Sequence, residues 1–274
     1  MSRIARRVLP GFRLSLGYTV FYLSLLVLIP LVACFLKAAE LSWAEFLQAA
    51  WSARARSAYW LTFECALVAA LVNRVLGLVV AWALVRYQFP FKTMIDALVD
   101  VPLALPTAVT GLVYASLYVQ DGWLGQFLVP LGLEAAYTKL GIVLVLIFTG
   151  FPFVVRAVQP VLAELNIEEE EAAAVMGGSR WQTFRWVIFP NLFPALLAGF
   201  TLAFARGVGE YGSVVFISSN MPFKTEIAPV LIVSRLEEFA YREAAAVAVV
   251  MLGFSFLLLT LISLVERWSK NHEE

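Results

Sequence analysis

Apolar residues run in six long, nearly unbroken stretches along this chain, separated by shorter segments that hold most of the charges. The stretches are continuous rather than alternating, which favours helices over strands. A run of about 20 apolar residues can cross a bilayer as a helix, and in lipid only helices and closed barrels satisfy their backbone polar groups. The pattern predicts an all-α membrane protein with six transmembrane helices, over residues 15–36, 59–85, 98–119, 140–155, 192–218 and 244–265.

Composition agrees with a chain that lies mostly in lipid. Hydrophobic residues make up 61% of the 274 residues and charged residues only 15%, whereas soluble domains carry about 25% charged residues. No short-period repeat and no low-complexity linker divides the sequence. We therefore expect a single transmembrane domain over residues 1–274.

Lysine and arginine positions indicate the orientation of the helices, because cytoplasmic loops are enriched in these residues. With the N-terminus inside, the cytoplasmic segments hold eleven lysines and arginines and the outer segments hold seven. The cluster of Arg3, Arg6, Arg7 and Arg13 decides this bias. The first apolar stretch is longer than the apolar core of a signal peptide, so we expect an uncleaved helix. The prediction is a multi-pass protein with both termini in the cytoplasm.

Groups typical of enzymes do not stand out in the sequence. Cys34 and Cys65 lie in apolar runs and the single histidine, His272, lies in the tail, so neither a metal site nor a disulfide framework is expected. We find no nucleophile with a matching base and no G-x-x-x-x-G-K-[ST] phosphate loop. The chain is therefore expected to lack a catalytic site and a cofactor of its own.

The segment 168–190, between the fourth and fifth expected helices, predicts the most detailed local structure. Its four opening glutamates suit the positive end of a helix dipole. Gly177 and Gly178 allow a left-handed stop, and Ser179 with Gln182 forms the pattern of a capping box for a second helix. We expect two short helices that form a stiff, exposed cytoplasmic loop.

This loop resembles the EAA loop of ABC importer permeases, whose pattern is E-A-A, three residues, G, nine residues, I, any residue, L-P. The matching positions are Glu171, Ala172, Ala173 and Gly177, followed after nine residues by Val187-Ile188-Phe189-Pro190. Val187 and Phe189 depart from the pattern but stay apolar. The resemblance implies the type I importer permease fold. It also implies that the first short helix couples to a separate ATPase through Glu171, Ala172, Ala173 and Gly177.

Charged residues inside the apolar stretches are functional candidates, because each costs about 2.5–3.5 kcal/mol on insertion scales. Arg74 lies in the second stretch and Arg206 in the fifth. Glu210 follows Arg206 by one helical turn, so the two can form an ion pair. The pair could lock the fifth helix against a neighbour, or Arg206 could lower the barrier for a passing anion. A gate is a third interpretation, and Arg74 has no assigned role.

Three further segments resemble oxyanion permeases of the sulfate, thiosulfate and molybdate type. They cover residues 100–112, 151–162 and 206–212. In the first of them Pro102 and Pro106 interrupt the third expected helix, and Thr107 and Thr110 can satisfy carbonyls that the prolines leave free. This interruption marks either a kinked packing helix or a discontinuous helix that lines a pathway. Pro106 and Thr107 therefore join Arg206 and Glu210 as candidates for the pathway or its gate.

The resemblance also implies partners and a location. It implies a second, distinct permease of the CysW type, two copies of a cytoplasmic ATP-binding subunit of the CysA type that would hold ATP-Mg, and a periplasmic sulfate- or thiosulfate-binding protein. Transport across the bacterial inner membrane would then proceed by alternating access. Two alternatives stay open: a molybdate or tungstate permease that pairs with itself, and an ion-gradient-driven secondary transporter.

Overall fold

The computed structural model describes residues 11–270, and helices make up nearly all of this part of the chain. Arg3, Arg6 and Arg7, on which the predicted orientation depends, lie outside the described residues, as does His272. The regular structure other than helix in the described residues is an isolated bridge between Tyr137 and Ser218.

Five helical segments of the described chain are long and apolar enough to cross a membrane, judged by length and composition. They are α1–η1–α2 (Phe12–Leu23, Ser24–Leu28, Ile29–Ala39), α4 (Ala53–Arg86), α9 (Lys139–Glu164), α11–η3–α12 (Arg180–Thr183, Phe184–Ile188, Phe189–Val208) and α15 (Tyr241–Lys270). A shorter apolar helix, α7 (Thr107–Tyr118), lies within the third expected stretch. The all-α prediction is therefore confirmed, with five long segments and one short one.

The third expected span, 98–119, is broken rather than continuous. Its residues fall in the end of α5 (Lys92–Val99), in the single turn of α6 (Val101–Ala104) and in α7. Leu105 is extended between α6 and α7, because a residue before a proline avoids the helical region. Of the two prolines expected to interrupt the helix, Pro106 causes this break, whereas Pro102 lies in the first turn of α6, where a proline is tolerated.

Two other expected boundaries also differ from the structure. The fourth span, 140–155, continues to Glu164, and α9 contains Pro152 and Pro160 in its interior. The fifth span, 192–218, stops being helical at Val208. A non-helical segment, residues 209–213, follows it and precedes the short helix α13 (Val214–Ile217). The side chain of Glu210 accounts for this ending, because it bonds the backbone beyond the helix.

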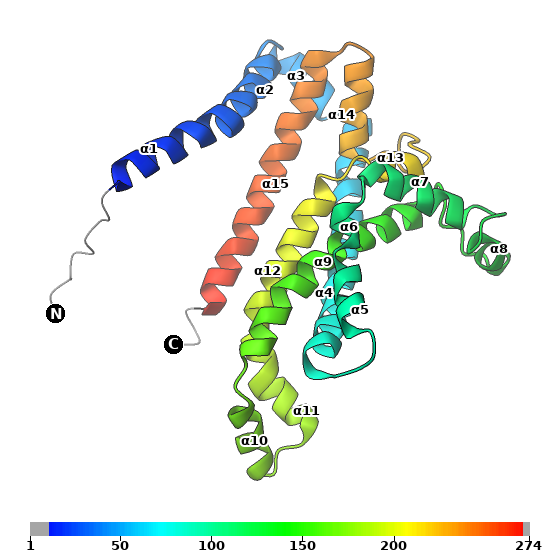
Figure 1. Ribbon diagram of the computed structural model, residues 1–274. Coiled ribbons are helices and arrows are strands. Elements are labelled where there is room, and N and C mark those ends of the chain that lie inside the picture. The colour runs from blue at the N-terminus through cyan, green and yellow to red at the C-terminus, as the bar shows by residue number, and fades with distance from the viewer. Residues whose placement is uncertain (1–10, 271–274) are drawn as a thin grey trace.

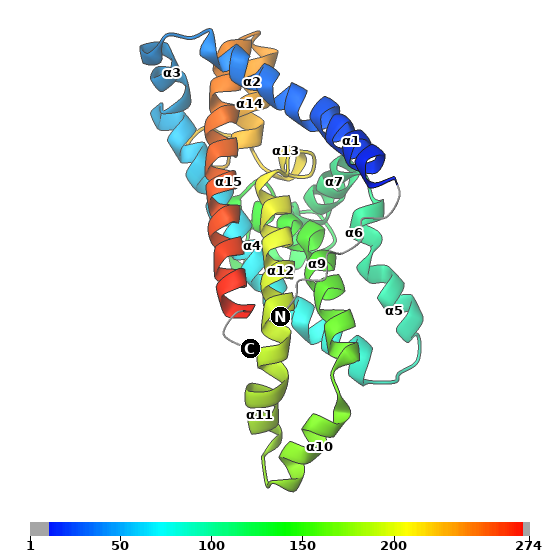
Figure 2. The same ribbon diagram turned by 90° about the vertical axis from the view of Figure 1, so that its left-hand side faces the viewer.

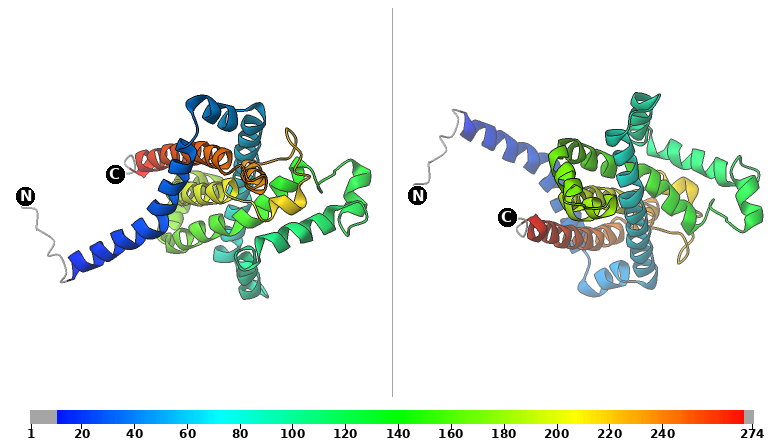
Figure 3. Two further views of the ribbon diagram at one scale, coloured as in Figure 1. Left: turned by 90° about the horizontal axis from the view of Figure 1, so that it is seen from above. Right: turned by 90° about the horizontal axis from the view of Figure 1, so that it is seen from below.

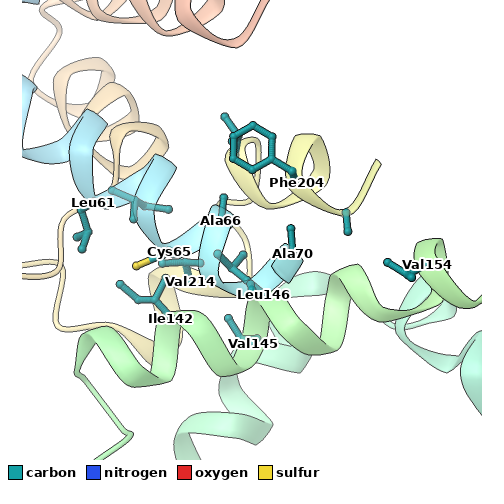
Figure 4. Close-up of a cluster of buried hydrophobic side chains, with 14 of the residues drawn as sticks. Leu61, Cys65, Ala66, Ala70, Ile142, Val145, Leu146, Val154, Phe204 and Val214 are labelled. Atoms are coloured by element: carbon teal, nitrogen blue, oxygen red, sulfur yellow. The ribbon is translucent and has the colours of Figure 1, made fainter. Parts of the chain in front are cut away.

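The core of the molecule is the contact among α4, α9 and α12 (Figure 4). Small residues let these helices approach closely, as is common in membrane helix packing. A Cβ on Gly207 of α12 would lie 3.2 Å from the Cβ of Ala66 on α4. One on Gly199 would lie 2.8 Å from the Cα of Val154 on α9. Larger residues at these positions would force the three helices apart.

Two ends of the molecule can be distinguished (Figures 1 and 2). The loop end carries α10 (Ile167–Val175) and α11, below the core in both views. The far end carries α3 (Trp43–Ala50), α13 and α14 (Ala228–Glu237). Two small elements, α8 (Gly125–Leu128) and η2 (Val129–Leu131), follow α7. Seen from above and below, α1 extends away from the bundle (Figure 3).

Candidate coupling loop and membrane-embedded ion pair

The loop at the loop end begins with α10, which is capped as its sequence predicts. Asn166 accepts a hydrogen bond from the backbone N–H of Glu168 at 3.2 Å, and three glutamates occupy the first turn. The helix ends before Gly177, whose φ of +84° is left-handed. A Cβ there would meet no atom within 4 Å, so backbone conformation alone is the reason for glycine.

The second short helix is α11, and its predicted capping box is confirmed. Ser179 Oγ accepts from the N–H of Gln182 at 3.3 Å, and Gln182 Oε1 accepts from the N–H of Ser179 at 2.7 Å. Helix α11 continues through the π-helical turn η3 into α12, so one continuous helical segment runs from Arg180 to Val208.

Large apolar side chains of this loop face solvent. Val175 is 88% exposed, Met176 82%, Trp181 66% and Trp186 71%. Met176 and Trp186 line a shallow hollow of about 320 Å³, to which Gly177 and Gly178 also contribute. Exposed apolar groups gathered around a hollow are typical of a protein-binding surface.

The residues that match the EAA pattern differ in how far they are exposed to solvent. Glu171 and Ala172 are exposed, and Ala173 is half-buried. Met176 follows directly after the end of α10. The structure thus places Glu171, Ala172, Ala173 and Gly177 together in one exposed element.

The loop is fastened to the end of α4 by contacts that sequence reasoning missed. Arg86, the last residue of α4, forms an ion pair with Glu170 of α10. The ring of Trp82 packs edge-to-face on Phe184, with centroids 5.7 Å apart. The Arg86 guanidinium lies 5.4 Å from the centroid of the Trp82 ring. The loop is therefore fixed to the core both at α10 and just after α11.

At the opposite end of α12, Arg206 and Glu210 form the predicted ion pair, with Nη1 and Oε2 2.5 Å apart. The two members differ in exposure: the Arg206 side chain is 34% exposed and that of Glu210 is 1% exposed. The other carboxylate oxygen of Glu210 accepts from Ser213 N–H at 3.0 Å and from Ser213 Oγ at 2.8 Å. Glu210 thus fixes the segment 209–213 through its bonds to Ser213, while part of the Arg206 side chain remains exposed.

The structure brings the two groups of pathway candidates together. A Cβ on Gly212 would lie 2.2 Å from Thr107 Oγ1, and one on Gly111 would lie 2.2 Å from the carbonyl oxygen of Ser213. The N-terminus of α7, directly after Pro106, therefore packs against the segment that Glu210 holds.

Arg74 does not join this site. Its guanidinium lies 5.3 Å from the centroid of Phe193 on α12, a cation–π contact between α4 and α12. Its neighbour Asn73 is fully buried, and among the described residues neither of its amide atoms has a hydrogen-bond partner.

A helical membrane bundle with an exposed, rigid EAA-type loop defines a permease of the ABC importer class. The chain belongs to the family described as binding-protein-dependent transport system inner membrane component, which matches residues 73–270. It is a transporter component and not an enzyme, in keeping with the permease proteins it is similar to.

Several relatives are similar over almost the whole chain. The sulfate transport system permease protein CysT of Salmonella typhimurium is 47% identical over 96% of this chain and 95% of its own length. The protein of the same name from Synechocystis is 49% identical over 93% of this chain and 89% of its own length.

Solved structures show the same fold at low sequence identity. The bacterial ABC transporter for import of the acidic polysaccharide alginate matches with a TM-score of 0.75 and 14% identity, covering 93% of this chain and 94% of that chain. The inward-facing MetNI methionine ABC transporter matches with a TM-score of 0.58 and 17% identity, covering 77% and 93%. The architecture is therefore the type I ABC importer permease fold.

Proposed function

We propose that this chain is the permease subunit of an ATP-driven importer that moves sulfate and thiosulfate across the bacterial inner membrane by alternating access. The observation that carries the proposal is the 47% identity, over 96% of the chain, to permeases named for sulfate transport. The names of these relatives favour sulfate over molybdate or tungstate. Membership of a binding-protein-dependent family favours ATP as the energy source over an ion gradient.

Coupling to a separate ATPase would occur through the loop 168–190. Its exposed apolar groups suit a partner groove, and its fastening to α4 would let a push on the loop move the core. Glu171, Ala172, Ala173 and Gly177 would form the contact. ATP-Mg would be held by the partner, because the chain contains no phosphate loop of its own.

The pathway would pass Arg206. Its accessible edge offers a positive charge to an anion, while Glu210 limits the strength of binding so that the anion can leave. Pro106 and Thr107, which lie at the contact with the segment 209–213, would form part of the gate.

We further propose an assembly of this subunit with a CysW-like permease, two CysA-like ATP-binding subunits and a periplasmic sulfate- or thiosulfate-binding protein. Both termini would lie in the cytoplasm, which places the loop end on the ATPase side. The excess of lysine and arginine in the corresponding segments supports this orientation. A reporter enzyme that is active only in the cytoplasm should be active when fused to either terminus.

Complementation tests the transport proposal. The gene is expressed in a bacterium that lacks its own sulfate permeases, together with the genes that neighbour it. Uptake of labelled sulfate should appear, should be inhibited by thiosulfate, and should stop when ATP is depleted. Uptake that competes only with molybdate, or that collapses with an uncoupler while ATP is maintained, would refute the proposal.

A further inference from the structure

Arg156, which lies on α9 between Pro152 and Pro160, binds two aspartates of the segment before the α6–α7 break. Its Nε and Nη2 donate to the Asp100 carboxylate at 2.9 and 2.6 Å, and its Nη1 donates to Asp96 Oδ1 at 2.7 Å. Gln159 donates to the same Asp96 oxygen at 2.9 Å. Hydrogen bonds from Gln159 and Arg156 hold the pKa of Asp96 below its ordinary value. We refer to Asp96, Asp100, Arg156 and Gln159 as the Arg156 network.

The Arg156 network is a polar contact that joins α5 to α9. Of the residues of α5 only Val99 is buried, while Met94 and Leu98 are more than half exposed. Apolar packing therefore holds α5 only weakly to α9. A bidentate guanidinium–carboxylate pair fixes both distance and direction, so it carries a displacement from one helix to the other more faithfully than a few apolar contacts would.

On the α9 side, the Arg156 network is connected to the loop 168–190, which we call the coupling loop. Only Leu165 and Asn166 separate the end of α9 from the start of α10. Asn166 is itself tied to α10 as its cap. A displacement of α10 therefore reaches the last turns of α9, close to Arg156 and Gln159.

On the α5 side, the network is connected through α6 and α7 to the Arg206–Glu210 ion pair. Asp100 directly precedes α6, and the two-residue link Leu105–Pro106 joins α6 to α7. Thr107, the first residue of α7, then packs against Gly212. Within the segment 209–213, Ser213 is bonded to Glu210, the partner of Arg206. An unbroken series of contacts thus joins the two candidate sites, which lie at different ends of the segment 180–208.

We propose that the Arg156 network transmits movement of the coupling loop to the Arg206–Glu210 pair, which makes Arg156 a positioning residue for transport. The inference rests on the proposed function, because a partner must move the loop. The proposal also gives a role to two of the segments that resemble oxyanion permeases. Residues 100–112 and residues 151–162 meet at the Asp100–Arg156 contact. A network that only braced α5 would stabilise the fold without linking ATP hydrolysis to uptake.

The test uses the complete transporter in vesicles and compares sulfate uptake with ATP hydrolysis. Asp100→Asn keeps the shape of the side chain and removes its charge. We expect uptake per ATP hydrolysed to fall about five- to tenfold, within the range of a typical coupling between sites, while hydrolysis stays within about twofold. The conservative variant Asp100→Glu, which keeps a carboxylate for Arg156, should retain most of the ratio. The matched control is Lys139→Gln, which removes another α9 ion pair, that with Glu64, off this route.

A second measurement does not depend on the transported anion. In a background with Cys34 and Cys65 replaced by alanine, Gly209→Cys places a thiol between Arg206 and Glu210 in the sequence, at an exposed position where a Cβ would meet no atom closer than 3.8 Å. Its labelling rate should change on addition of ATP, and Asp100→Asn should abolish this change.

The outcomes separate the two proposals. The parent complex could take up no sulfate and still show a Gly209→Cys labelling rate that responds to ATP only when Asp100 is present. The transport assignment would then fail, and the transmission inference would stand. If uptake and hydrolysis fall in equal proportion in Asp100→Asn, or the labelling response persists, the network is a brace and the inference is overturned.

Discussion

Replacing Arg206 distinguishes a structural ion pair from a pathway residue. In Arg206→Met the Glu210 carboxylate, 1% exposed, keeps its two bonds from Ser213 but loses its counter-charge. The loss of a charged partner at such a group costs about 1.5–3 kcal/mol. We expect the midpoint of thermal unfolding to fall by several degrees and sulfate uptake to fall further than the amount of assembled complex.

The double variant Arg206→Met with Glu210→Gln gives the decisive comparison. The glutamine side chain introduced by Glu210→Gln carries no charge, and its amide oxygen can still accept from Ser213 N–H and Oγ. Removing both charges of a buried pair is often close to neutral for stability, so the unfolding midpoint should recover. Uptake should stay low, because the positive charge presented to the anion is gone.

Thermal unfolding in detergent and labelled-sulfate uptake in vesicles are measured on the same four proteins, the parent, both single variants and the double variant. Recovery of uptake together with stability in the double variant would refute the pathway role and leave the pair as a purely structural contact. Low uptake with restored stability would support Arg206 as part of the pathway.

Three further predictions concern the loop and the core. Gly177→Ala places a side chain on a residue with a left-handed backbone, which costs about 1–2 kcal/mol, and should weaken association with the ATPase in a pull-down. The control Gly132→Ala should leave this association unchanged, although Gly132 also has a left-handed backbone and no atom within 4 Å of its Cβ. Glu171→Ala should lower ATP-driven uptake without removing the subunit from the membrane, and the control Glu169→Ala should leave uptake near the parent level. Asn73→Ala removes a buried amide without a partner among the described residues, so the unfolding midpoint should hold or rise; a clear fall would show that the amide is bonded in the assembled protein.

Features that depend on neighbouring residues in the chain could be predicted from the sequence. The apolar runs located the long helices, because lipid imposes a minimum length on each. The cap at Ser179, the left-handed Gly177 and the break at Pro106 follow from local backbone chemistry. The Arg206–Glu210 pair was predictable because its members lie one turn apart.

Features that depend on distant segments could not be predicted in the same way. The packing of the segment 209–213 on α7 joins residues that are far apart in the chain, and no local pattern records it. The Arg86–Glu170 pair joins residues 84 positions apart. The aspartate partners of Arg156 lie 56 and 60 positions away. Several carboxylates stood within plausible reach of each arginine, and only the packing of helices selects among them.

The exposed apolar groups of the coupling loop have a consequence for the life of the subunit before assembly. In the proposed orientation Val175, Met176, Trp181 and Trp186 face the cytoplasm until a partner covers them. Such a surface is the kind that proteases and chaperones bind. A subunit made in excess of its ATPase would therefore be degraded first, and the loop would keep the two proteins in matched amounts.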